Sequence, residues 1–299
     1  MRKKDYTLFV KPYQKILFFL FLISLGLVIG ILVRSKNSYP STNPIETGQP
    51  VATQSAFSTA VEEAQKKEEE KQRQQEETKK FIATYGPCRF VPVLMYHHVA
   101  NKSGSLYVRP DIFASQMNYL NQKGYTSVTL SDVMESLISG KPLPAKPVII
   151  TFDDGYKDIY QNAYGVLNFN NQKATLFIIT QLLGGSDYLN WEELREMAGN
   201  PLITVGDHTL SHRSLTLITA AEVKNEIVSA KSILEANLGV TVNTFAYPYG
   251  TFNGEAEQIL SQSGFAAAVT THYGLTCAKL PFEIPRVRVG NSQLSAYGL

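Results

Sequence analysis

The chain has 299 residues and a formal net charge of +2 at pH 7, a length that allows one large domain or two small ones. Its basic excess lies close to the N-terminus, whereas residues 85–299 carry about 15 Lys and Arg against about 17 Asp and Glu. Because no basic field marks this region, nucleic-acid binding is excluded as its function.

Two N-terminal segments predict a membrane anchor. Residues 1–15 form a basic tail, in which five Lys and Arg stand against a single Asp. Residues 16–33 are an uncharged apolar run, and about 18 residues at a rise of 1.5 Å come close to spanning a bilayer core. The basic flank predicts a cytoplasmic N-terminus. A cleaved signal peptide is the alternative, but the run is long and no small-x-small site follows it, which favours an uncleaved transmembrane helix.

A linker and a charged helical stalk are predicted over residues 34–84. Residues 35–58 are rich in Ser, Thr, Asn and Pro, a composition typical of extended linkers. Residues 60–80 consist of helix formers of both charge signs without an apolar stripe, which predicts a solvated helix or stalk. A coiled coil is the alternative, although the a and d positions are not apolar.

The composition becomes globular from Cys88, and residues 85–299 are predicted to form one domain. The predicted strands cover residues 90–96, 125–129, 148–152, 174–179, 202–207, 243–247 and 265–270. The predicted helices cover residues 112–123, 130–138 (capped by Ser131 and ended by Gly140), 157–168, 191–198, 219–237 and 253–263. This alternation indicates an α/β fold with a mostly parallel sheet. Seven or so strands could close into a barrel, which would place functional groups at the carboxyl ends of the strands.

Cys88 and Cys277 are the only cysteines, and they flank the globular region. With this region outside the cell, one disulfide could join its two ends. Two unpaired thiols are the alternative.

The strand predicted at 148–152 ends in two adjacent carboxylates, Asp153 and Asp154, followed by Gly155. Carboxylates at the end of a buried strand are costly unless a positive group compensates them, and a divalent cation is the usual compensation. Neighbouring side chains point in different directions, so that one can bind a metal while the other faces a substrate. The alternative is that both cap the next helix in water.

A histidine pair follows about 50 residues later. His208 and His212 come after another apolar strand, and their i, i+4 spacing would put both imidazoles on one face of a helical turn. Two His with one carboxylate and open positions is a usual catalytic site for zinc or a similar metal. Thr209 stands where a His-Glu-x-x-His metalloprotease would have its Glu, which excludes that class.

These motifs carry a resemblance to a known family. Thr-Phe-Asp-Asp-Gly at 151–155 followed by His-Thr-x-Ser-His at 208–212 is similar to the polysaccharide deacetylases of the NodB-homology class, carbohydrate esterase family 4. The likeness runs from about residue 90 to near the end. It implies a distorted (β/α) barrel with Asp153 as the catalytic base. It also implies a divalent metal, Zn²⁺ foremost with Co²⁺, Ni²⁺ and Mn²⁺ as alternatives, on Asp154, His208 and His212.

A third motif departs from the family pattern. Tyr247, Pro248 and Tyr249 resemble the family's Arg-x-Pro-Tyr groove motif, but Ala246 occupies the Arg position. The resemblance implies that these residues bind substrate, with the backbone N–H of Tyr249 holding the oxyanion. The alternative for this stretch is a turn packed by aromatic rings.

In the family the missing Arg orients the base, so Asp153 needs a substitute. Arg286, in the sequence Ile-Pro-Arg-Val-Arg at 284–288, is one candidate. The alternative is that it is an ordinary surface Arg.

The resemblance also requires a general acid, and two residues compete. His272 matches the late position usual in the family, but lacks the usual apolar context. His97, at the end of the first predicted strand, resembles the acid of the circularly permuted branch that acts on poly-N-acetylglucosamine, and is favoured. His98 should point away from the site by strand alternation. Trp191 resembles the family Trp that lines the acetyl pocket, and a helix-start aromatic packed into the core is its alternative.

The predicted function is therefore a metal-dependent polysaccharide N-deacetylase, anchored in a bacterial cell membrane with its catalytic domain, residues 85–299, outside. Its expected partners are the membrane and an N-acetylglucosamine-containing polysaccharide, either peptidoglycan or poly-N-acetylglucosamine. Two alternatives stay open. One is an O-acetyl esterase acting on xylan-like sugars, and the other is a non-catalytic carbohydrate-binding descendant.

Overall fold

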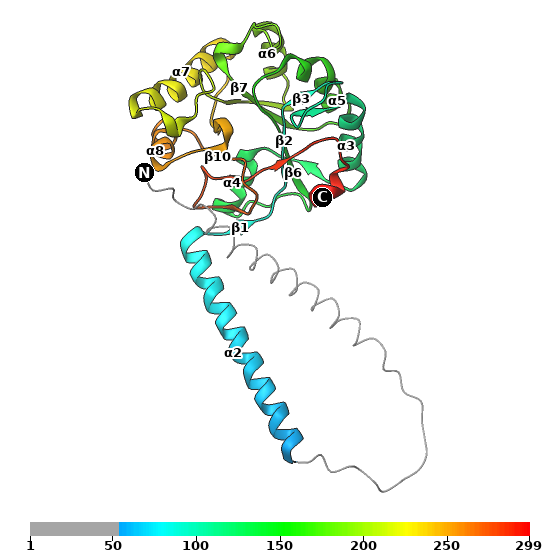
Figure 1. Cartoon of the computed structure of the whole chain (residues 1–299), viewed down its shortest axis with the longest axis vertical. Helices are drawn as coiled ribbons and strands as arrows, with labels where there is room; N and C mark the ends of the chain where they lie inside the picture. The colour runs from blue at the N-terminus through cyan, green and yellow to red at the C-terminus, as the bar shows by residue number, and fades with distance from the viewer. Residues whose placement is uncertain (1–53) are drawn as a thin grey trace. The chain divides into compact units, whose positions relative to one another are not determined.

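The computed structural model of the chain describes residues 54–299 (Figure 1). The predicted basic tail at 1–15 and transmembrane helix at 16–33 lie outside the described residues, as does the first part of the predicted linker. Within residues 54–299, no helix combines the length and the hydropathy needed to cross a membrane.

The predicted helical stalk corresponds to one long helix, α2 (Gln54–Tyr85). Its side chains from Glu62 to Lys80 are exposed, except for the half-buried Gln74. Exposed ion pairs of the i, i+3 type, such as Glu68–Lys71 at 3.6 Å, line its surface. A helix of this composition has no face to bury, as the absence of an apolar stripe predicted.

The globular region alternates strands and helices in the predicted order. The strands are β1 (Cys88–Arg89), β2 (Val93–Tyr96), β3 (His98–Val99), β4 (Tyr107–Val108), β5 (Thr126–Ser127), β6 (Pro147–Phe152), β7 (Ala174–Ile178), β8 (Ile203–Asp207), β9 (Thr244–Ala246), β10 (Ala267–Val269), β11 (Thr276–Cys277) and β12 (Val287–Arg288). The α-helices are α3 (Pro110–Gln122), α4 (Leu130–Ser139), α5 (Tyr164–Phe169), α6 (Trp191–Ala198), α7 (Ala220–Leu238) and α8 (Gly254–Gln262). Short helical turns are η2 (Ile159–Ala163), η3 (Thr180–Leu182), η4 (Leu215–Leu217), η5 (Pro248–Gly250) and η6 (Leu294–Tyr297).

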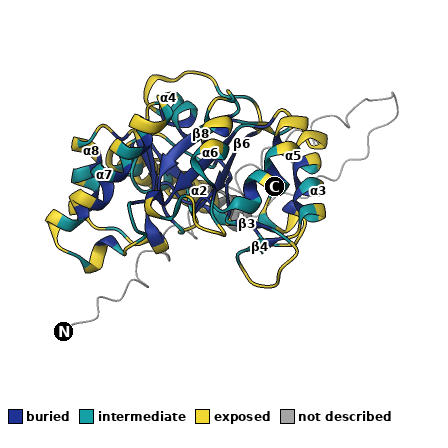
Figure 2. Cartoon of the chain, turned by 90° about the horizontal axis from the view of Figure 1, so that it is seen from above, coloured by how far each residue is buried: buried dark blue, intermediate teal, exposed yellow. Residues whose placement is uncertain are grey.

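The main sheet has eight strands and follows the order β10-β9-β8-β7-β6-β2-β12, with β5 added beside β6. Each of its pairings is parallel, so the predicted α/β fold with a parallel sheet is confirmed. Helices α3, α5, α6, α7 and α8 lie around the strands (Figure 1). The strands form the buried interior, and the helices turn their exposed faces outward (Figure 2).

The sheet curls until one short stretch contacts both of its edges. Residues 284–289, here named the bridging segment, form a parallel bridge to β10 between Ile284 and Val269. Further along, Val287 and Arg288 pair with β2. Sequence periodicity gave no element here because the stretch is short and contains Pro285. Its place between β10 and β2 puts Arg286 at the centre of the curled sheet.

Local capping explains where the helices begin and end. Helix α4 starts at a capping box in which Thr129 Oγ1 accepts the N–H of Asp132, and the Asp132 carboxylate accepts the N–H of Thr129. The predicted cap Ser131 is therefore wrong by two residues, because the box needs an acidic side chain three positions after the cap. Gly140 ends this helix in the left-handed conformation, at φ 77°, as predicted.

The helix predicted at 157–168 differs from the observed structure. Residues Ile159–Ala163 form a π-turn, and α5 begins only at Tyr164. The Asp158 carboxylate that precedes this turn binds His98 Nδ1 at 2.7 Å and the N–H of Val99 at 3.1 Å. Its side chain is thus used across the fold and makes no cap hydrogen bond to the turn.

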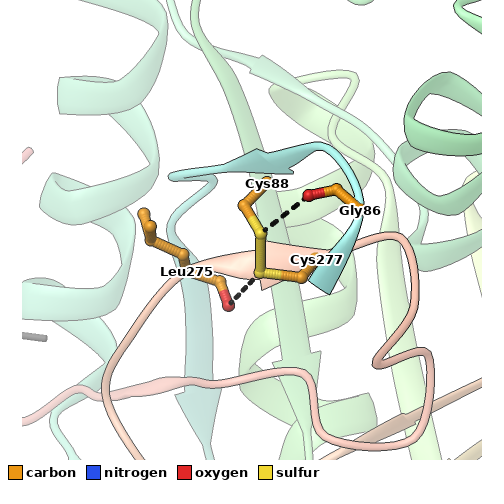
Figure 3. The surroundings of a disulfide bond; sticks show 4 residues. All are labelled: Gly86, Cys88, Leu275 and Cys277. Atoms are coloured by element: carbon orange, nitrogen blue, oxygen red, sulfur yellow. Dashed lines mark hydrogen bonds between the residues drawn. A yellow bond between two sulfur atoms is a disulfide. The ribbon is translucent and has the colours of Figure 1, made fainter. Parts of the chain in front are cut away.

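One disulfide, between Cys88 and Cys277, joins strands β1 and β11 (Figure 3). The two cysteines are direct antiparallel partners and lie 189 residues apart in sequence. The predicted disulfide is confirmed, and the alternative of two free thiols is wrong. A cross-link over such a long loop removes many conformations from the unfolded chain, which stabilises the fold in the chain-entropy account.

Candidate active site

Parallel strands bring the polar residues of the sequence motifs to one edge of the sheet. Tyr96 of β2 is the register partner of Phe152 of β6, so that His97 and Asp153, which follow them, emerge side by side. Strand β8 ends at Asp207, in register with Ile178 of β7. The carboxyl ends of parallel strands meet at one edge, where barrel enzymes carry their catalytic groups.

Three of these side chains converge on one point. Oδ1 of Asp154 lies 3.3 Å from Nε2 of His208 and 3.5 Å from Nε2 of His212. One ligand atom from each of the three residues lies within 4.8 Å of the others. The two histidines and the carboxylate predicted as metal ligands are therefore close enough in space to share one ion.

The chemistry of this cluster fits a divalent cation. Oδ1 of Asp154 is buried and has no partner in hydrogen-bonding geometry, so that the two nearby imidazoles are its only close polar neighbours given for the described residues. Nδ1 of His208 lies 2.7 Å from the carbonyl oxygen of Ala246, which orients Nε2 toward the cluster. Metal-binding imidazoles usually donate their second N–H in this way. A buried carboxylate oxygen that faces two imidazoles, one of them oriented by a hydrogen bond, is the donor set of a two-His, one-carboxylate metal centre.

The histidine pair does not lie on a helix, so that part of the prediction is wrong. Residues 208–214 form an irregular loop after β8, in which Thr209 and His212 have φ values of 69° and 62°. The N–H of Thr209 donates to Oδ1 of Asp207 at 2.7 Å, and the N–H of His212 donates to Oγ1 of Thr209 at 2.9 Å. Side-chain hydrogen bonds thus fold the loop back and bring the imidazoles together, as a helical turn would have done.

Left-handed backbone marks the same region. Among the described residues, positive φ in a non-glycine residue occurs at Asp154, Asn171, Thr209, His212 and Tyr249. All but Asn171 belong to the sequence motifs of the site. Such conformations cost free energy and persist where the surroundings impose them, which is common at functional sites.

The surroundings shift the pKa values of the cluster in opposite directions. Burial alone would raise the pKa of Asp154, but the nearby imidazoles, chiefly that of His208, together outweigh this effect and hold the pKa below its ordinary value. Burial alone would lower the pKa of His208, yet the carboxylates of Asp154 and Asp153 together outweigh this effect and raise that pKa. The pKa of His212 is lowered by burial and by the nearby His208. The Asp154 carboxylate is therefore ionised at neutral pH, as a metal ligand must be.

The neighbouring carboxylate, Asp153, has a different partner. Nη1 and Nη2 of Arg286 donate to its two oxygens, each at 2.7 Å, and both side chains are nearly inaccessible to solvent. Burial alone would raise the pKa of Asp153, but this ion pair outweighs it and holds the pKa below its ordinary value. Arg286 therefore stands beside Asp153, where the sequence lacked the family Arg, and the alternative of a surface Arg is wrong because only 2% of the residue is exposed.

Two buried acceptors outside the bridging segment fix Arg286 in turn. Its Nε donates to the carbonyl oxygen of Thr270 at 2.8 Å, and Nη1 also donates to Oγ1 of Thr151 at 3.1 Å. Four of the five N–H donors of the guanidinium thus bind buried acceptors, and the side chain is inaccessible to solvent. It can orient Asp153, but it has no free face for direct contact with a substrate.

The two candidate general acids differ in their surroundings. Nε2 of His97 lies 3.9 Å from Oδ2 of Asp153, with 13% of its side chain exposed. Burial lowers the pKa of His97, although Asp153 opposes this effect. His272 is exposed, and its ring lies 6.2 Å from that of Phe252. No ion pair of residues 54–299 includes His272 at 4.0 Å or less, so that of the two only His97 adjoins a site carboxylate.

His98 is held apart from the metal cluster, as strand alternation predicted. Its Nδ1 lies 2.7 Å from Oδ2 of Asp158. Its ring stacks between Tyr107 at 4.2 Å and Tyr156 at 3.5 Å, measured between ring centroids. The side chain therefore has a packing role in the wall beside the site.

The aromatic motif after β9 splits into a buried and an exposed part. Tyr247 is buried and stacks on Phe252, with ring centroids 5.0 Å apart. Tyr249 is 65% exposed, and its ring lies 4.7 Å from that of His212. An open groove of about 630 Å³ adjoins it and is lined by His212, Arg213, Ser214, Leu217, Ile218 and Tyr249. Of these motif residues, Tyr249 is therefore the one that faces the groove, while Tyr247 packs in the core.

Trp191 occupies the first turn of α6, directly after the cap residue Asn190. It is partly buried against the main core, and the Arg195 guanidinium lies 6.0 Å from its ring centroid. These contacts match the packing alternative for this residue. Its predicted role in lining an acetyl pocket stays a prediction.

Sequence reasoning missed one residue that lies behind this site, Glu226. Its carboxylate, from α7, accepts hydrogen bonds from Ser211 in the histidine loop. A signal was present, because Val223, Glu226, Ile227 and Ala230 share one helical stripe and the other three are apolar. An acidic residue inside a buried stripe needs a partner.

The fold and the site together define a class of protein, that of α/β proteins with a candidate metal site at the carboxyl edge of a parallel sheet. A family model described as polysaccharide deacetylase matches residues 140–268. YxkH of Bacillus subtilis (strain 168), provisionally named a polysaccharide deacetylase, is 32% identical over 223 residues, which are 74% of this chain and 79% of that protein.

Two further comparisons extend this result. The poly-beta-1,6-N-acetyl-D-glucosamine N-deacetylase of Escherichia coli (strain K12) is 26% identical over 67% of this chain, but the match spans only 36% of that longer protein. The structure of the Streptococcus pyogenes deacetylase PplD in complex with acetate superimposes with a TM-score of 0.65 at 28% identity, covering 68% of this chain and 93% of that one. The chain belongs to the polysaccharide deacetylase family, and it is a hydrolase of the polysaccharide N-deacetylase class.

Proposed function

We propose that this protein removes N-acetyl groups from an extracellular N-acetylglucosamine polymer, either poly-β-1,6-N-acetylglucosamine or peptidoglycan, in a metal-dependent reaction. The observation that carries the proposal is the pairing of two adjacent carboxylates with different partners. Asp154 faces His208 and His212, whereas Asp153 is held by Arg286. The substrate class is supported by the name of the Escherichia coli relative.

In this proposal Asp154, His208 and His212 hold the metal, with Zn²⁺ as the first candidate and Co²⁺, Ni²⁺ and Mn²⁺ as alternatives. When bound, such an ion supplies Lewis-acid polarisation of a carbonyl and lowers the pKa of water. Asp153, ionised and oriented by Arg286, takes the proton as water attacks the acetyl carbon. His97 donates a proton to the departing amine of glucosamine. The backbone N–H of Tyr249 donates to the oxyanion that forms on the acetyl group.

The proposed location follows from the predicted N-terminal segments. Residues 1–15 would lie in the cytoplasm, 16–33 would span the membrane, and 34–84 would form the linker and stalk. The catalytic domain, residues 85–299, would then act outside a bacterial cell. The Cys88–Cys277 disulfide supports this location, because disulfides persist in oxidising compartments.

Acetate release by the full chain tests the proposal. The substrates are a β-1,6-linked N-acetylglucosamine oligomer, peptidoglycan and acetyl-xylan, each with and without a chelator. We expect release from one of the two N-acetylglucosamine substrates, its loss on chelation, and its recovery when Zn²⁺ or Co²⁺ is added. Release from acetyl-xylan alone would point to an O-acetyl esterase, and release that a chelator leaves unchanged would contradict metal dependence.

The choice of general acid gives a separate prediction. His97→Ala is expected to lower the rate of acetate release by about 10²–10⁴-fold, the usual contribution of a positioned acid. His272→Ala should leave the rate close to that of the unaltered chain, because its ring is exposed and pairs with no site carboxylate among residues 54–299. Steady-state kinetics of both variants on the same oligomer decide the matter. The reverse ranking would move the acid to His272.

A further inference from the structure

The loop that carries His212 needs support from outside itself. Residues 208–214 belong to no helix or strand, and backbone hydrogen bonds join only the first three of them, residues 208–210, to residues 178–181. His212 is also the more exposed of the two imidazole ligands, with 24% of its side chain accessible against 3% for His208. A metal ligand on such a loop is held in place only as well as its neighbours are.

One residue of α7 supplies three further hydrogen bonds, all to the two residues directly before His212. Oε2 of Glu226 accepts the N–H of Ser211 at 2.8 Å, and Oε1 accepts the Ser211 hydroxyl at 2.6 Å. The backbone carbonyl oxygen of Glu226 accepts the N–H of Leu210 at 3.0 Å. The two residues directly before His212 are thus bonded to a single residue of a long helix.

The position of Glu226 is costly for the helix. The residue is only 4% exposed, and it lies in the buried stripe of α7 with Val223 and Ile227. No ion pair within residues 54–299 at 4.0 Å or less includes its carboxylate, so that hydrogen bonds to Ser211 are its compensation. An apolar side chain of similar volume would satisfy the stripe without this desolvation cost. The cost is explained if the carboxylate serves the loop.

We propose that Glu226 is a positioning residue that holds His212 in its metal-binding place through Ser211. This inference rests on the proposed function, because it takes Asp154, His208 and His212 as the metal ligands. Glu226 touches neither the metal site nor the groove. It acts on the orientation of one ligand, as residues behind metal ligands commonly do, and substitutions of such residues cost about 10–100-fold in metal affinity.

The test measures Zn²⁺ affinity of the metal-free full chain in competition with a chromophoric chelator. Glu226→Ala is expected to bind Zn²⁺ about 10–100-fold more weakly, with an altered absorption spectrum when Co²⁺ is bound instead. Glu226→Gln keeps one acceptor oxygen for the Ser211 N–H and should therefore lose less Zn²⁺ affinity than Glu226→Ala. Ser211→Ala removes the hydroxyl donor alone and should also lose less Zn²⁺ affinity than Glu226→Ala. The losses of Glu226→Ala and Ser211→Ala should be less than additive in the double variant, since they share one interaction.

Glu235→Ala is the matched control. Glu235 lies on the same helix, and its carboxylate also accepts a loop N–H, that of Val242 at 3.0 Å, together with Lys231 Nζ at 2.8 Å. The Glu235→Ala substitution should lower thermal stability yet leave Zn²⁺ affinity and the Co²⁺ spectrum unchanged.

Unaltered Zn²⁺ affinity in Glu226→Ala would overturn the proposal. An equal loss of Zn²⁺ affinity in Glu226→Ala and in the control Glu235→Ala would overturn it as well. If Glu226→Ala fails to fold, the Zn²⁺ affinities of Glu226→Gln and Ser211→Ala test the proposal. Unaltered Zn²⁺ affinity in both of these variants would overturn it. Failure of the unaltered chain to bind Zn²⁺ would overturn the proposed metal site itself, a result that the same titration separates from the others.

Discussion

Asp153→Asn is expected to lower acetate release by about 10²–10⁴-fold, the usual contribution of a general base, while the protein still binds metal. The side chain of Asp153 is directed to Arg286, whereas Asp154 faces the imidazoles. An asparagine keeps an acceptor oxygen for the guanidinium but cannot take a proton at neutral pH. Steady-state kinetics and metal analysis on the same preparation measure both quantities.

Asp154→Asn provides the matched comparison, since it alters the adjacent carboxylate in the same chemical way. It should lose both bound metal and activity, because Oδ1 of Asp154 is the atom that both histidines approach. Circular dichroism would establish that each variant is folded at the assay temperature. A wild-type rate in Asp153→Asn, or loss of metal from that variant, would contradict the division of roles.

Arg286→Met is expected to lower the free energy of unfolding by about 3–5 kcal/mol, because removing one partner of a buried ion pair leaves the other charge uncompensated. Methionine keeps much of the aliphatic packing, so that the lost charge is the main change. Without the guanidinium, burial would raise the pKa of Asp153, and the carboxylate would also lose its orientation. Acetate release should therefore fall as well. Urea unfolding and kinetics on the same variant measure the two effects.

The neighbouring Arg288 provides the control, because it lies two residues further along the bridging segment and is exposed. Arg288→Met should change the unfolding free energy by less than about 0.5 kcal/mol, as surface substitutions usually do. The double variant Asp153→Asn with Arg286→Met should recover stability relative to Arg286→Met alone, but not activity. Equal stability of Arg286→Met and the unaltered chain would show that the pair does not hold the site together.

Much of the fold was predictable because its elements carry local signals. The strand at β6 is a run of β-branched and aromatic residues, and α7 has helical spacing between a capping Thr219 and the closing Gly239. The ligand set Asp154, His208 and His212 was predictable too, from residue types and order. Parallel strands then bring these residues to one edge whatever the details of the loops between them.

The remainder depends on contacts between distant parts of the chain. The i, i+4 spacing of the histidines predicted a helical turn, but Asp207 and Thr209 side chains compete for the backbone and fold a loop instead. The bridging segment has too few residues to show a period, and its pairing with both β10 and β2 is a tertiary effect. For the same reason, sequence reasoning offered Arg286 only as a candidate, and contact with Asp153 required the curled sheet.

The bridging segment also makes the proposed base depend on a late part of the chain. His97, Asp153, Asp154, His208 and His212 all precede this segment in sequence, whereas Arg286, the partner of Asp153, lies within it. Asp154 approaches His208 and His212 instead. The counter-charge of Asp153 and the candidate metal ligands therefore come from separate parts of the sequence.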